Sequence, residues 1–76
     1  MSKKYISEFE ALRLLQDPNW EYQGKSPLHS PYGYYSIDRD IWVNKKTGER
    51  LIHATGYEGF LRVNYVDVWI LVKPEK

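Results

Sequence analysis

The sequence predicts a small α+β domain, in which one N-terminal helix packs on a four- to five-stranded, mostly antiparallel, bent sheet. Three features predict it: a helix start signal before an apolar helical period at 7–15, a turn-rich connection at 44–48, and a C-terminal segment rich in β-branched and aromatic residues at 60–73. The 76 residues suffice for one domain with one small core. We therefore expect a single domain over 1–76, with residues 1–4 and 74–76 frayed.

The helix has both a start and a stop signal. Ser7 and Glu10 have the S-x-x-E spacing of a capping box, in which the serine hydroxyl accepts from the backbone N–H three residues on. An apolar face with a helical period follows, made by Phe9, Ala11, Leu12, Leu14 and Leu15. Asp17-Pro18 ends it, because a residue before proline avoids the α region. This pattern predicts a helix over about 7–16, too short to be stable without a sheet beneath it.

Short strands separated by turn formers account for the rest of the chain. Alternation predicts a strand at 20–23, and the residues of 24–31 predict a loop. Further strands are expected at 34–37 and 41–43. A connection at 44–48 closes a hairpin with 49–54, with Gly48 suited to positive φ. Glycines flank a second connection at 56–59.

The alternation of apolar residues shifts by one position midway through the last segment, 60–73. One parity carries Leu61, Val63 and Tyr65, and the other carries Val66, Val68, Ile70 and Val72. A flat strand cannot bury both sets on one face, so we expect a β-bulge or bend near 64–66. Trp69 then lies beside Asp67, on the face opposite Val68 and Ile70. We expect a central strand covered by the helix on one side and by aromatic residues on the other.

Composition narrows the class of protein. A formal charge of +1 lacks the basic excess of a dedicated duplex-DNA binder. The chain has no cysteine, which removes disulfides and thiolate metal sites. No apolar run approaches a membrane span, and the first residues lack the apolar segment of a secretory signal. We expect a cytoplasmic protein without a membrane partner.

The chemistry-bearing residues do not form a motif for catalysis, a metal or a cofactor. His29 falls in the predicted loop and His53 in a strand, with no zinc-ligand spacing around them. The serines at 26, 30 and 36 lack the G-x-S-x-G context of a nucleophile. Gly56-Tyr57-Glu58-Gly59 leads into a strand, unlike a phosphate-binding loop. We expect no enzyme, no metal site and no cofactor.

Aromatic residues predict a contact surface instead. Six of the twelve aromatic residues lie between Trp20 and Trp42, among glycines, prolines and serines. Tyr32, Tyr34 and Tyr57 adjoin glycines and are expected to be exposed. With Leu28 and His29 they would form an amphipathic patch suited to a protein partner. Basic residues are expected at the rim of this patch, where they would steer association: Lys45, Lys46 and Arg50.

Two other functions fit the same residues. In a nucleic-acid-binding module, bases would stack on the tyrosines while lysines hold phosphates, and binding would weaken steeply with salt. In a small-molecule sponge, an oligomer of this domain would form pockets at its interfaces. The sequence does not fix the oligomeric state.

In style, the whole chain resembles the small single-domain accessory proteins that bacteriophages and other mobile elements encode. The likeness lies in its length, its lack of cysteine, and a capped helix that reads Phe9-Glu10-Ala11-Leu12-Arg13-Leu14-Leu15 before a short antiparallel sheet. The resemblance implies a non-enzymatic, stoichiometric inhibitor that sterically blocks a host or defence protein, such as a CRISPR effector complex, in the host cytoplasm. It implies no role for an individual residue.

Overall fold

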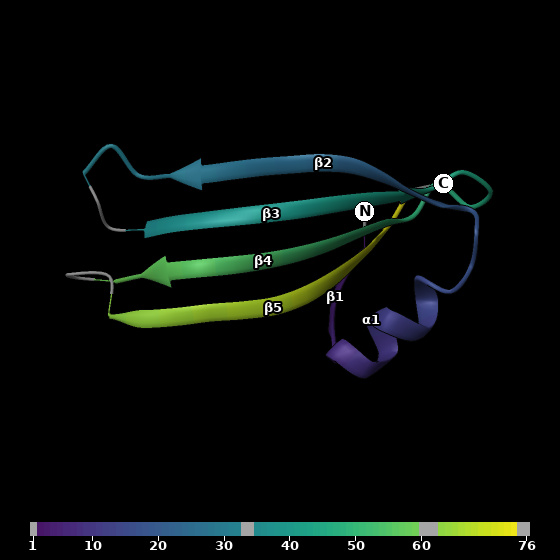
Figure 1. Cartoon of the computed structure of the whole chain (residues 1–76), viewed down its shortest axis with the longest axis horizontal. Coiled ribbons are helices and arrows are strands. Elements are labelled where there is room, and N and C mark those ends of the chain that lie inside the picture. Colours follow the sequence, from purple (N-terminus) through teal and green to yellow (C-terminus); the bar gives the residue numbers. More distant parts are fainter. Residues whose placement is uncertain (1, 33–34, 60–62, 75–76) are drawn as a thin grey trace.

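The computed structural model describes residues 2–32, 35–59 and 63–74, which form one short helix and five antiparallel strands in a single open sheet (Figure 1). The elements are β1 (Ser2–Ile6), α1 (Glu8–Leu14), β2 (Trp20–His29), β3 (Tyr35–Asn44), β4 (Arg50–Glu58) and β5 (Asn64–Lys73). The order across the sheet is β1-β5-β4-β3-β2. The predicted antiparallel sheet is confirmed, and the predicted α+β class fits in outline, because strands dominate and one short helix accompanies them.

The helix begins as predicted. The Ser7 hydroxyl accepts a hydrogen bond from the backbone N–H of Glu10 at 3.1 Å, which satisfies one of the free donors of the first turn. The helix ends at Leu14, earlier than the predicted 16. Beyond the Leu15 cap, the N–H groups of Gln16 and Asp17 bond to carbonyls three residues back, so the chain tightens into turns before Pro18.

Two sequence predictions underestimated the strands. Residues 2–4 are not frayed, because β1 pairs with β5 from Ser2 opposite Lys73 to Ile6 opposite Trp69. The predicted loop at 24–31 is wrong for most of its length, because β2 continues to His29. A bulge between Tyr22 and Gly24 bends β2, and Pro27 is tolerated because β2 lies at the sheet edge.

The β3–β4 hairpin is confirmed at its predicted turn. Gly48 has a φ of 78°. The buried side chain of Asn44 accepts from the backbone N–H groups of Lys46 and Thr47 at 2.9 and 3.0 Å. The second predicted connection, 56–59, is wrong in its position, because β4 runs through Gly56 to Glu58. A Cβ on Gly56 would lie 2.1 Å from the Ser36 carbonyl oxygen, so close strand pairing requires glycine there.

The predicted bulge at 64–66 is also wrong. β5 pairs with β4 in one unbroken register from Asn64 to Val72. Leu61 lies outside the described residues, and Val63 and Tyr65 are exposed at 72% and 61%, so these residues do not belong to the core. The same parity enters the core only farther along β5, at Trp69 and Leu71. Trp69 does share a face with Asp67, as expected from alternation along β5.

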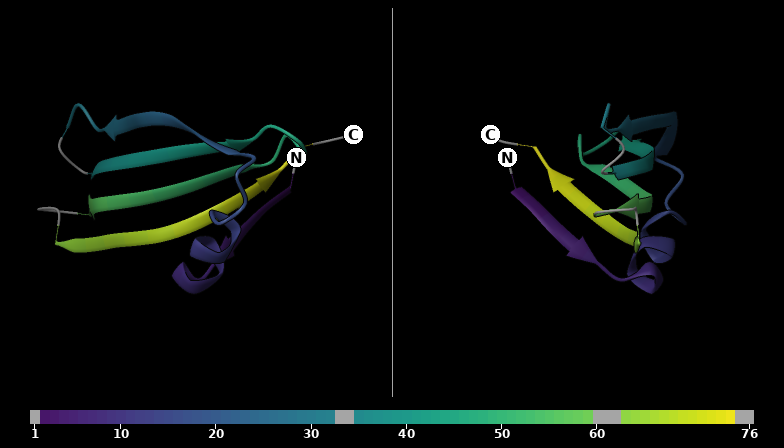
Figure 2. Two further views of the ribbon diagram at one scale, coloured as in Figure 1. Left: turned by 45° about the vertical axis from the view of Figure 1, so that its right-hand side comes forward. Right: turned by 90° about the vertical axis from the view of Figure 1, so that its left-hand side faces the viewer.

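The core lies at one end of the sheet, under the helix (Figure 2). Its buried members are Ala11, Leu51, Trp69 and Leu71, and around them pack Ile6, Leu14, Leu15, Trp20 and Trp42. Trp42 and Trp69 stack at 5.7 Å between ring centroids. We call the side of the sheet that meets α1 the helix face, and the opposite side the aliphatic face. In the part of the chain that the structure describes, no helix is long and apolar enough to cross a membrane.

Candidate protein-binding surfaces

Exposed apolar side chains gather at the end of the sheet farthest from the helix. We call this surface the aromatic end and define it by Tyr32, Tyr57 and Tyr65, which are 83%, 50% and 61% exposed. Tyr57 and Tyr65 are paired across β4 and β5, and their rings meet edge to face at 5.3 Å. Each ring limits the motion of the other, so the pair presents a partly ordered aromatic surface.

The sequence predicted part of this surface. Tyr32 and Tyr57 are exposed at the same end of the sheet, as predicted. Leu28 is also exposed at this end, but it pairs with Ile37 and so projects from the aliphatic face, opposite to Tyr57, and does not join one patch with it. Tyr34 falls outside the described residues. Tyr65 was missed as a site residue because its strand pattern was assigned to the core. Its cross-strand position opposite Tyr57 becomes visible only when β4 and β5 are in register.

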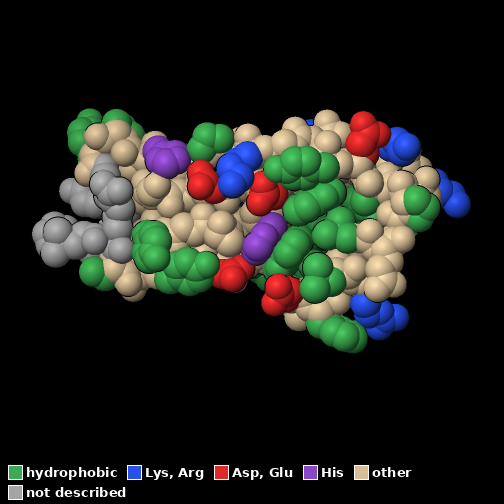
Figure 3. Space-filling model, in the orientation of Figure 1, with side chains coloured by type: hydrophobic (Ala, Val, Ile, Leu, Met, Phe, Trp, Pro, Cys, Tyr) green, Lys and Arg blue, Asp and Glu red, His purple; other side chains and the backbone are tan. Residues whose placement is uncertain are grey.

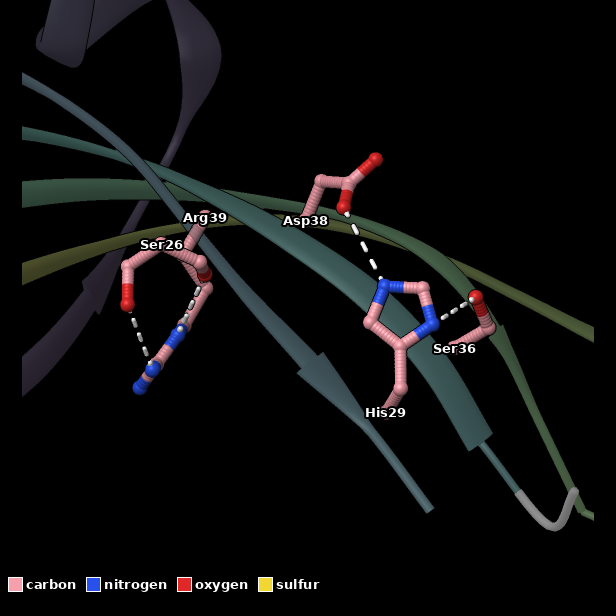
Figure 4. Close-up of polar contacts among 5 residues, drawn as sticks. All are labelled: Ser26, His29, Ser36, Asp38 and Arg39. Atoms are coloured by element: carbon pink, nitrogen blue, oxygen red, sulfur yellow. Dashed lines mark hydrogen bonds and ion pairs between the residues drawn. The ribbon is translucent and has the colours of Figure 1, made fainter. Parts of the chain in front are cut away.

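His29 is held in β2 by polar contacts to β3 (Figure 4). Its Nδ1 lies 3.0 Å from Ser36 Oγ, and its Nε2 lies 3.6 Å from Asp38 Oδ1. On the other side of β3, Arg39 donates to the backbone oxygen and the hydroxyl of Ser26 at 3.2 and 3.1 Å. Both sets of contacts tie the edge strand to the sheet, so the backbone beneath Leu28 is fixed.

The serine, histidine and carboxylate around His29 have the composition of a hydrolytic triad, but their geometry differs. The 3.6 Å separation from Asp38 is too long for a hydrogen bond that would orient the ring. The side chains of His29 and Asp38 are 55% and 47% exposed, so water screens their interaction. This arrangement supports a structural cross-strand contact better than an activated nucleophile.

The predicted basic rim does not adjoin the aromatic end. Lys45 and Lys46 lie in the β3–β4 turn and Arg50 begins β4, at the end of the sheet near the helix. β3 alone spans ten residues, so about 30 Å separates its two ends. Lys45 also faces Glu21, at 3.9 Å. The prediction that these cations border the aromatic patch is therefore wrong, because the connection between the lysines and the tyrosines runs the length of a strand.

Charged side chains occupy the middle of the helix face. Figure 3 shows acidic side chains and one histidine between the apolar area near the helix and the far end, and the second histidine beside hydrophobic side chains of the far end. His53 Nε2 lies 2.8 Å from Asp67 Oδ1, while the imidazole stacks on Trp69 with ring centroids 4.0 Å apart. Tyr22 donates to Asp40 at 2.7 Å. This hydrogen bond, then burial and the negative charge of Asp40, raise the pKa of the Tyr22 phenol above its ordinary value.

We call His53, Asp67, Tyr22 and Asp40 the polar band, and the sequence did not predict it as a site. Its signal in the sequence is the parity of Asp67 and Trp69, which the strand pattern did identify. The described residues include no group of three histidine, cysteine or acidic side chains arranged to hold a metal ion.

Comparison with known proteins adds no relative. No family model, no curated protein and no solved structure matches the chain significantly.

Proposed function

We propose that this chain is a non-enzymatic protein-binding protein that acts by steric occlusion. The observation that carries the proposal is the aromatic end, where Tyr32, Tyr57 and Tyr65 are at least half exposed on a fixed sheet. Tyrosine gives a large contact area at a small cost in side-chain entropy, so exposed tyrosines are efficient anchors for a partner.

The class of partner follows from the resemblance to phage-encoded accessory proteins. We infer a cytoplasmic inhibitor of a host or defence protein, such as a CRISPR effector, which itself can be a nucleoprotein complex. Lys45, Lys46 and Arg50 then act at a distance from the anchors. They would contribute to the rate of encounter with an acidic partner and not to the contact around Tyr57.

Nucleic acid binding receives less support from the geometry. A single-strand-binding sheet places stacking rings and phosphate-binding cations side by side. Here Lys45, Lys46 and Arg50 lie at the opposite end from the tyrosines, and Lys25 lies opposite Asp40 in the middle of β2. Asp38 and Asp67 lie on the helix face, on which Tyr57 and Tyr65 also project. These carboxylates would repel a phosphate backbone drawn along that face.

The experiment is an affinity pull-down from the lysate of a bacterial host, with nuclease and added salt, read by mass spectrometry. Tyr57→Ala removes an anchor, while Phe9→Ala is the control, because Phe9 is an aromatic residue 73% exposed on α1, away from the aromatic end. We expect the wild type and Phe9→Ala to retain a stoichiometric protein. We expect Tyr57→Ala to lose about tenfold or more in affinity for it, as a binding hot spot does.

Two results would contradict the proposal. Equal affinity of folded Tyr57→Ala and Tyr32→Ala variants would remove the aromatic end as the binding surface. Loss of every partner on nuclease treatment would favour the nucleic-acid module, with the tyrosines as stacking platforms.

A further inference from the structure

The aliphatic face of the sheet is the largest feature that the proposed function does not use. Strand register aligns two rows on it: Ile41, Ile52 and Ile70 form one, and Ile37, Gly56 and Val66 form another. Between them lies a third row, Arg39, Ala54 and Val68. The isoleucine row makes a ridge, whereas the small residues Ala54 and Gly56 leave a hollow along β4.

This hollow is a groove of about 560 Å³. Its lining includes Leu28, Ile37, Val66, Val68 and Ile70, together with Arg39 and Glu58. The helix packs on the other side of the sheet, through Ala11 against Leu51 and Trp69. Among the described residues, no element lies across the aliphatic face (Figure 2).

This chain is larger in surface and radius than a compact monomer of its mass. A compact protein of this mass exposes about 4900 Å², whereas this chain exposes 5670 Å². Its radius of gyration is 13.5 Å, compared with about 11 Å for a compact domain of this length. The surplus is about 800 Å², which is what one partner contributes to a standard stable interface.

We propose that a second copy of this chain covers the aliphatic face, so that two sheets pack face to face as a symmetric dimer. The face is self-complementary. A twofold axis between the ridge and the groove places the isoleucine row of each copy over Ala54 and Gly56 of the other. Charged side chains also line the groove, Arg39 together with the carboxylates of Glu58 and Asp67. A twofold interface can bring Arg39 of each copy to a carboxylate of the other.

A second copy is favoured over a different partner because the chain needs this cover to be stable. At this length, without cysteine and with its main core cluster at one end of the helix face, self-association is a principal means of adding buried apolar area. An interface rich in isoleucine and valine is typical of permanent homodimers. The dimer would also carry two aromatic ends, which makes bivalent binding available to it.

The test is the molar mass of the purified wild-type protein across a wide concentration range, by sedimentation or light scattering. We expect twice the chain mass of 9.1 kDa, with Val68→Lys weakening association at least a hundredfold. Thr55→Lys is the matched control. It introduces the same residue at a half-buried position of the neighbouring strand, but on the helix face between Asp38 and Asp67, and it should leave the mass unchanged.

A folded wild type that is monomeric at every concentration would overturn the proposal, as would a Val68→Lys variant that dimerises as tightly as the wild type. If Val68→Lys does not fold, the nearly isosteric Val68→Thr replaces it, and at least a tenfold weaker dimer is expected. Tyr57→Ala should not change the mass, so failure of the dimer and failure of the aromatic end as a binding surface are separate results.

Discussion

Replacing Leu51 by alanine tests whether the stability of this chain depends on the small cluster under the helix. Leu51 is fully buried, in contact with the cluster of Ala11, Trp69 and Leu71. Truncating such a leucine removes its transfer free energy and leaves a cavity, at a cost of about 3–4 kcal/mol. A chain of this length has a total free energy of unfolding of about 4–11 kcal/mol. The substitution should therefore remove a large part of it.

Urea unfolding followed by tryptophan fluorescence measures this effect, because Trp42 and Trp69 stack inside the cluster. With a slope of about 1 kcal/mol per molar urea, the midpoint should fall by about 3 M or the variant should be unfolded without denaturant. Protein concentration must be equal in all samples, since a dimer makes stability concentration-dependent.

The control is Leu12→Ala, the same substitution at a helix position that is 51% exposed. It should change the free energy of unfolding by less than about 0.5 kcal/mol. If Leu51→Ala costs no more than Leu12→Ala, then the cluster is not the main source of stability and the reasoning about the core is refuted.

Three further perturbations test particular contacts. Gly56→Ala should lose more than about 2 kcal/mol by urea unfolding, since its Cβ would meet the Ser36 carbonyl oxygen; near-neutral stability would contradict the close pairing. Ser7→Ala should cost about 1 kcal/mol by thermal unfolding, and no change would exclude a stabilising cap. Asp40→Asn should lower the Tyr22 pKa followed by NMR. In the wild type the folded state favours the protonated phenol, so this contribution to stability is present below pH 10 and is lost as pH rises toward the folded pKa.

Signals contained in a few neighbouring residues were sufficient to predict the helix start and the central hairpin. The Ser7–Glu10 spacing and the turn ending at Gly48 both specify hydrogen bonds within four residues, and both occur. The strand β1 could not be predicted in this way. Its residues Ser2 to Tyr5 are exposed and do not alternate in polarity, so its extended form depends on pairing with β5, more than sixty positions later.

The difference between local signals and long-range pairing also explains which properties of the candidate site could be predicted. Proximity to glycine was a valid local indication that Tyr32 and Tyr57 are exposed. Which of the predicted residues lie next to one another depends on contacts between distant parts of the chain. Lys45 is separated from the tyrosines by the whole length of β3, and Leu28 and His29 lie in a strand because Gly24 permits a bulge instead of ending the strand. Strand lengths and register decided which residues meet, and neither followed from composition.

The two faces of the sheet differ in how well they tolerate contact with water, and this difference links the two proposals. A helix of seven residues spans about 10 Å, whereas the longest strands run about 30 Å. The rest of the helix face must therefore be compatible with water, and it carries His53, Asp67 and Asp40 there. The residues that alternate with them on the other side are Ile52, Val68 and Ile41, with no comparable band of carboxylates among the described strand centres. Beyond the helix, the same strands alternate between a polar side and an aliphatic side. This is the pattern of a sheet with one solvated face and one face packed against protein. The aromatic end lies beyond the polar band, where a partner can reach it without displacing the contact that the aliphatic face requires.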